Sequence, residues 1–145
     1  MSEPSPFLAA YQGGFINMLR WEDYDRLVEA LRQHNDGNWY VYAVGEPPPQ
    51  QPASASEVET FLTEVSRLIR EDHGEDYCGI VYADQREQPS FVKFYDPNNL
   101  GASCGSSGRH VTPGWIMSRL APEDLKQAFP LPGNRRRWWK RLFAS

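Results

Sequence analysis

The segment between residues 56 and 73 constrains the fold most, because its apolar side chains fall on a single face of a helix. They recur at intervals of three and four residues and comprise Val58, Phe61, Leu62, Val65, Leu68 and Ile69. Ser56-Glu-Val-Glu59 has the spacing of a capping box, in which each end side chain bonds to the other's backbone N–H. The sequence therefore predicts a helix that starts at Ser56, ends at His73-Gly74 and buries one face against another element.

The remaining segments predict a second helix and a small sheet. Apolar residues recur at helical spacing from Trp21 to Leu31, and Gly37 can take the left-handed conformation that stops a helix. Runs of aromatic and β-branched residues predict strands, and two of these runs flank a polar connection of hairpin length. The predicted strands cover residues 39–44, 78–83 and 91–95, with a fourth short strand at 115–117. A brief helix is predicted at residues 122–129, where Pro122 suits the first turn.

These elements predict an α+β fold in which a three- to four-stranded, mainly antiparallel sheet packs against two main helices. Residues 1–133 are expected to form a single domain. It begins with an irregular lead-in over residues 1–20 and contains a Pro-rich loop at residues 45–55. Within the lead-in, apolar clusters predict short helical turns at residues 7–11 and 15–19.

Composition narrows the class of protein. At 145 residues, 40% hydrophobic and 13% aromatic, the chain is long enough to bury a core without disulfide bonds. Its two cysteines, Cys78 and Cys104, are too few for a secreted disulfide framework and favour the reducing cytoplasm. The N-terminus lacks the basic and apolar regions of a signal peptide, and no apolar run is long enough to span a bilayer. Any membrane contact is therefore expected to be peripheral.

The last twelve residues, 134–145, are expected to form a separate basic, amphipathic segment, which we call the tail. The tail carries five of the 15 basic residues and no acidic one, which leaves 10 basic and 19 acidic residues, a net charge of −9, in residues 1–133. Wound as a helix, the tail collects its large apolar side chains on one face, namely Trp138, Trp139, Leu142 and Phe143. The other face collects most of the charge, namely Arg136, Arg137, Lys140 and Arg141, and only Arg135 falls among the apolar residues. An isolated helix this short is marginal in water, so the tail is expected to dock on a surface.

A protein partner with an acidic, apolar groove meets the chemical demands of the tail, and a second copy of this acidic chain is one such partner. We therefore interpret the chain as a small, non-catalytic accessory protein that docks on a protein partner through the tail. Two other uses stay open: the tail could fold back onto its own domain, or make weak, salt-sensitive contact with an anionic membrane. Nucleic acid is the least favoured partner, because the body is acidic and no groove-reading motif accompanies the tail.

An alternative class is a thiol-dependent enzyme centred on Cys104 and His110. Cys104 lies in the Gly/Ser-rich segment 101–110, whose backbone N–H groups could face an oxyanion, and His110 could act as the base that activates the thiol. However, no helical pattern follows Cys104, and no second cysteine lies nearby in the sequence. A small residue in a turn is the simpler interpretation, which favours a chain without catalysis of its own.

Histidines and tyrosines supply two further candidate sites. His73 lies close to Glu75 and Asp76, but His34, His73 and His110 lack the spacing of helix-borne metal ligands, so neither a metal nor a cofactor is predicted. Five tyrosines could share a sheet face and form a recognition surface, or could lie at the core edge with their hydroxyls toward water. They are Tyr40, Tyr42, Tyr77, Tyr82 and Tyr95.

Overall fold

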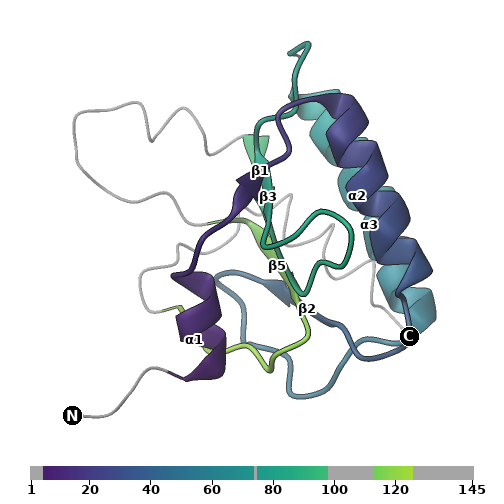
Figure 1. Cartoon of the computed structure of the whole chain (residues 1–145). Helices are drawn as coiled ribbons and strands as arrows, with labels where there is room; N and C mark the ends of the chain where they lie inside the picture. Colours follow the sequence, from purple (N-terminus) through teal and green to yellow (C-terminus); the bar gives the residue numbers. More distant parts are fainter. Residues whose placement is uncertain (1–4, 74, 98–112, 126–145) are drawn as a thin grey trace.

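The computed structural model describes residues 5–73, 75–97 and 113–125, and within them the chain has an α+β fold. Five strands form one open antiparallel sheet in the order β1-β3-β4-β5-β2. In chain order the strands are β1 (Ile16–Asn17), β2 (Tyr40–Ala43), β3 (Val81–Ala83), β4 (Phe91–Phe94) and β5 (Trp115–Ser118). Helices lie on both faces of this sheet, so the described part of the chain has three layers (Figure 1).

Two long helices pack side by side against one face of the sheet, as the sequence predicts. These are α2 (Trp21–Gln33) and α3 (Ala55–Asp72), which run antiparallel to each other (Figure 1). Their apolar faces and the facing sides of the strands form the main core, whose largest buried side chains are Tyr24, Trp39, Phe61, Phe94 and Trp115. Burial of the two amphipathic faces predicted from the sequence therefore builds most of the core.

A shorter helix, α1 (Pro6–Tyr11), lies against the opposite face and builds a second, smaller core. The Ser5 side chain caps it by accepting a hydrogen bond from the Leu8 N–H at 3.2 Å. The Phe7 ring packs on the rings of Tyr42 and Phe91, at centroid distances of 6.2 and 5.3 Å. This helix confirms the turn predicted at residues 7–11.

The sheet has five strands rather than the three or four predicted, and β1 was not foreseen. The sequence predicts a helical turn at residues 15–19, and this prediction is wrong: Ile16 and Asn17 pair with β3 instead. The Met18 N–H donates to the Val81 carbonyl at 2.8 Å, and the Met18 side chain is buried in the main core. Pairing satisfies backbone groups that a lone helical turn would leave to water, so the tertiary contact overrides the local pattern.

The other strands follow the prediction more closely. β3 and β4 form the expected hairpin, with Val81 opposite Phe94. β5 covers the strand predicted at residues 115–117 and lies between β4 and β2, antiparallel to both. The last described strand of the chain therefore joins the hairpin to β2, which comes much earlier in the sequence.

The helix α3 starts earlier than predicted, at a capping box formed by Ser54 rather than Ser56. The Ser54 side chain accepts from the Glu57 N–H at 3.1 Å, and the Glu57 carboxylate accepts from the Ser54 N–H at 2.9 Å. The residue before the cap, Ala53, donates its N–H to the Trp39 carbonyl at 2.8 Å, next to β2. This hydrogen bond fixes the chain just before Ser54, so that the capping box of Ser54 and Glu57 can form. The helix ends at Asp72 with His73 as its C-cap, as expected.

Two loop predictions have different outcomes. The Pro-rich loop is present, and Gly37 takes the expected left-handed conformation, with φ of 83°. The brief helix predicted at residues 122–129 is wrong in its described part, because residues 121–125 are irregular. There the buried Leu125 N–H donates to the Tyr42 hydroxyl at 3.3 Å, a bond to the sheet rather than to a helical neighbour. Residues 126–129 lie outside the described residues.

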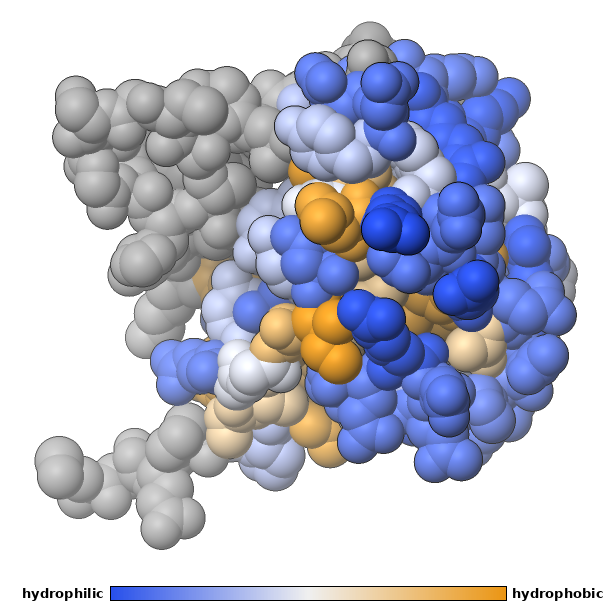
Figure 2. Space-filling model, turned by 45° about the horizontal axis from the view of Figure 1, so that its top comes forward, coloured by the Kyte–Doolittle hydropathy of each residue, from blue (hydrophilic) through white to orange (hydrophobic). Residues whose placement is uncertain are grey.

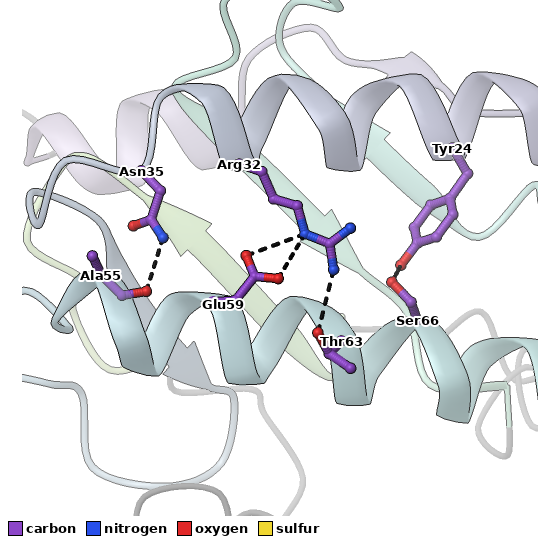
Figure 3. A network of polar contacts seen from close by, with 7 residues as sticks. All are labelled: Tyr24, Arg32, Asn35, Ala55, Glu59, Thr63 and Ser66. Atoms are coloured by element: carbon purple, nitrogen blue, oxygen red, sulfur yellow. Dashed lines mark hydrogen bonds and ion pairs between the residues drawn. The ribbon is translucent and has the colours of Figure 1, made fainter.

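Polar contacts join α2 to α3 and fix where their ends meet (Figure 3). The Arg32 Nε lies 2.9 and 3.1 Å from the two Glu59 carboxylate oxygens, and the same guanidinium donates to the Thr63 hydroxyl at 3.2 Å. The Asn35 side chain donates to the Ala55 carbonyl at 2.8 Å, which ties the end of α2 to the start of α3. As a consequence, the start of α2 lies beside the end of α3.

Candidate functional site

The binding and catalytic residues predicted from the sequence lie outside the described residues. These are the tail residues Arg136, Arg137, Trp138, Trp139, Lys140, Arg141, Leu142 and Phe143, and the candidate nucleophile and base Cys104 and His110. Their roles stay predictions. The described residues, however, form a candidate site that was not predicted from the sequence.

This site is a wide, shallow cavity at the end of the helix pair where α2 begins and α3 ends. It has a volume of about 480 Å³ and is lined by Trp21, Asp25, Arg70, His73 and Glu75. Two of these residues come from the first turns of α2, and the others come from the last turn of α3 and the residues after it. We call it the helix-end cavity.

Hydrogen bonds and ring contacts hold the lining of the helix-end cavity in place. The Trp21 indole N–H donates to the Glu75 carbonyl at 3.1 Å. The Arg70 guanidinium lies over the Trp21 ring, 4.9 Å from its centre, and forms an ion pair with Asp25 at 2.6 Å. His73 Nε2 lies 2.9 Å from the Cys78 carbonyl, so this ring nitrogen is the one that carries a proton in this bond. The Trp21 ring of α2 is thus held in place by Arg70 of α3 and by the backbone after α3.

The exposed Tyr77 ring adjoins the helix-end cavity through the lining residue His73, and Leu19 is an exposed apolar side chain close to Tyr77. Leu19 is 56% exposed and Tyr77 is 49% exposed, and the Tyr77 ring packs edge-on against His73 at 5.8 Å. Both exposed side chains lie close to Gly79, whose φ is +71°: a Cβ there would be 3.0 Å from the Tyr77 ring and 3.9 Å from Leu19. Figure 2 turns this end of the molecule toward the viewer and shows hydrophobic side chains set among strongly hydrophilic ones.

The end of the helix pair that holds the cavity is rich in acidic residues, and the cavity lining itself has Asp25 and Glu75 against Arg70. Residues 20–26 and 70–76 together hold seven acidic residues and three arginines, and Arg70 is already paired with Asp25. Glu71, Glu75 and Asp76 are exposed, and no ion pair within the described part of the chain joins them to a basic residue. An open, aromatic cavity with a negative surround is suited to a ligand that is both cationic and apolar.

Lys93 forms a second cluster with aromatic residues, on the α1 face of the sheet. Its ammonium lies 4.1 Å from the Tyr11 ring centre and 4.0 Å from that of Phe15, and it donates to the Tyr11 carbonyl at 2.7 Å. Burial lowers the pKa of Lys93 to about 8. Burial also raises the pKa of Tyr11 to about 12, helped by nearby tyrosines. These contacts satisfy the ammonium and hold α1 and the residues after it on the sheet.

The predicted tyrosine face is only partly formed. Tyr42 is fully buried in the smaller core, and the half-buried rings of Tyr82 and Tyr95 contact each other at 5.5 Å, which fits side chains at a core edge. Tyr77 does not lie on a strand: it precedes β3 and packs on the cavity-lining residue His73. Tyr40 is half-buried.

The remaining titratable candidates have structural roles in the described part of the chain. Cys78 is fully buried in the main core, and this burial raises the pKa of its thiol, which disfavours a reactive thiolate. The His34 carbonyl accepts hydrogen bonds from the Trp39 indole at 3.1 Å and from Arg119 at 2.9 Å. His34 and His73 cap opposite ends of the helix pair, so these two histidines do not come together.

Comparisons with known proteins do not assign a family. No protein-family model, no characterised protein and no solved structure matches the chain. Within the described residues, no helix is long and apolar enough to cross a bilayer. The chemistry of the helix-end cavity and of the tail is therefore the basis on which a function can be inferred.

Proposed function

We propose that this chain is a small, non-catalytic accessory protein that docks on a protein partner through its tail. The observation that carries this proposal is the separation of charge along the chain: the tail has a charge of +5, and residues 1–133 have a charge of −9. The apolar tail residues Trp138, Trp139, Leu142 and Phe143 would be the buried anchors, because aromatic side chains dominate the energy of protein interfaces. The reducing cytoplasm is the setting that two cysteines favour.

A protein groove suits the tail better than a membrane surface does. Each basic residue near an anionic bilayer contributes about 1 kcal/mol, so five would give weak, salt-sensitive binding. The acidic helix layer opposes even this, because α2 and α3 together carry nine acidic and four basic residues. An acidic protein groove attracts the same charges, and it also buries the two tryptophans.

The test compares the full-length protein with variants of the tail as baits in co-purification. We expect a specific partner to bind the wild type and to be lost from Arg136→Gln/Arg137→Gln and from a chain that ends at Gly133. The matched control is Arg26→Gln/Arg86→Gln, which removes the same charge from two exposed arginines of the described body. Thermal unfolding should give nearly the same Tm for all four proteins. Equal partner recovery by all baits would exclude the tail as the docking element, and a large fall in Tm would show that the tail is part of the core.

A further inference from the structure

We propose that the helix-end cavity is the receptor for the tail of a second copy of this chain. This inference rests on the proposed docking function and names the partner and the surface. Two copies would each provide one tail and one cavity, so that the contact is reciprocal and closes as a two-fold dimer. Each binding site is then complete only when the other copy contributes its tail.

Charge is the first property that matches the two surfaces. The tail has five basic residues and no acidic one, and residues 20–26 and 70–76 have seven acidic residues against three arginines. Glu75 lines the helix-end cavity, and Glu71 and Asp76 are exposed residues next to the lining residues Arg70 and Glu75 in the chain, so all three are available to incoming guanidinium groups. Opposite potentials on two surfaces steer their encounter and favour this pairing over others.

Apolar chemistry is the second property, and it is independent of charge. The helix-end cavity offers the Trp21 ring as a wall, the exposed Tyr77 ring packs on its lining residue His73, and the exposed Leu19 lies close to Tyr77. The tail offers two adjacent tryptophans followed by Leu142 and Phe143. Aromatic rings pack edge-to-face or offset on one another, and Trp, Tyr and Arg are the residues that most often dominate binding energy. The cavity is therefore suited to a Trp/Arg segment rather than to a purely charged one.

Self-association explains both properties with one partner. An anionic membrane would repel the same acidic end of the helix pair that a basic tail would bind. The wide opening of the helix-end cavity admits a segment from outside the molecule, because its lining residues are reached from solvent where α2 begins and α3 ends. A second copy supplies both the positive charge and the aromatic anchors.

The experiment is sedimentation equilibrium of the full-length chain over a range of concentrations, with charge-reversal variants. The cavity variant is Glu71→Lys/Glu75→Lys, and the tail variant is Arg136→Glu/Arg137→Glu. The control, Glu29→Lys/Glu87→Lys, makes the same change of net charge at a different hollow of about 350 Å³ beside α2. A chain that combines the cavity and tail changes tests whether the reversed charges recognise each other.

We expect the wild type and the control to form dimers of equal affinity, and each single-surface variant to associate roughly tenfold or more weakly. The combined chain should recover most of the lost affinity, and added salt should weaken the wild-type dimer. Leu19→Ser is a second variant that leaves the charge unchanged. It replaces the exposed apolar side chain close to Tyr77, and it should also weaken the dimer.

A wild type that is monomeric at every concentration overturns the inference. A tail that binds its own molecule would give this result. A dimer that survives both Glu71→Lys/Glu75→Lys and Leu19→Ser overturns the assignment of the surface. Neither result removes the proposed docking function if a different protein, captured in the co-purification, still requires the tail. If the wild type is monomeric and also captures no protein through its tail in the co-purification, both the dimer and the proposed docking function are excluded.

Discussion

The Tyr24 hydroxyl and the Ser66 side-chain oxygen lie 2.6 Å apart and join the two long helices beneath their charged surface (Figure 3). Tyr24 is completely buried, and that burial raises the pKa of its phenol. A buried hydroxyl without a partner costs free energy, so Ser66 satisfies a group that water does not reach. This pair therefore adds a buried polar contact to the packing of α2 on α3.

Replacement of Ser66 by alanine should destabilise the fold by about 1–3 kcal/mol, because it leaves the Tyr24 hydroxyl buried and unbonded. Urea unfolding of the two proteins measures the difference. The matched control is the double variant Tyr24→Phe/Ser66→Ala, which removes both polar groups and should be more stable than Ser66→Ala alone. A Ser66→Ala variant as stable as the wild type would show that the hydroxyl finds another partner.

Two serines near the start of α3 provide a matched pair for a second prediction. Ser54→Ala should cost about 1 kcal/mol of stability, because it removes the side chain that accepts the Glu57 N–H. Ser56→Ala should change stability by less than about 0.5 kcal/mol, because Ser56 is an exposed residue inside the helix. Denaturant unfolding of both variants distinguishes the two caps. An equal loss in both, or a larger loss for Ser56→Ala, would argue for the later start.

These two serines also show what could be predicted from the sequence and what could not. The helices, the hairpin and the last strand were predictable, because their apolar periods are local. The choice between Ser54 and Ser56 was not, because both match the capping box and the contact of Ala53 with Trp39 decides between them. The strand β1 was missed because two residues carry no period, and only pairing with β3 identifies them.

The helix-end cavity also could not be predicted from local sequence patterns, because it is formed by a tertiary contact. Trp21 and His73 were each recognised in the sequence, one as the first residue of a helical pattern and the other at the end of a helix. Nothing local shows that they meet, because their closeness arises from the antiparallel packing of α2 on α3. The density of acids at the end of α3 was the available signal: four of the seven residues from 70 to 76 are acidic.

Lys93 should make stability depend on pH. The unfolded chain keeps this proton up to a pKa of 10.5, whereas in the folded chain burial lowers the pKa to about 8. Between these values the unfolded state binds more protons, so the contribution of Lys93 to the free energy of unfolding increases as the pH rises. The gain should be about 1–2 kcal/mol, less than the full shift would give, because the amine is partly solvated.

The measurement is the free energy of unfolding of the wild type and of Lys93→Met between about pH 7 and pH 10.5. Their difference should be constant below about pH 8 and should shift in favour of the wild type above it. Tyrosine ionisation affects both proteins and largely cancels in the difference. A difference that does not change across this range would mean that Lys93 keeps an ordinary pKa in the folded protein.

The two cysteines allow a direct test of the alternative thiol-enzyme hypothesis. Cys78 is fully buried with a raised thiol pKa, so it should not react with iodoacetamide in the native protein and should react readily in denaturant. Native alkylation, followed by mass spectrometry, then reports on Cys104 alone. We expect its rate to rise with pH around about 8.5, the value of an ordinary thiol, and to be unchanged by His110→Ala. An apparent pKa well below that value, restored toward it by His110→Ala, would instead support a thiolate nucleophile activated by His110.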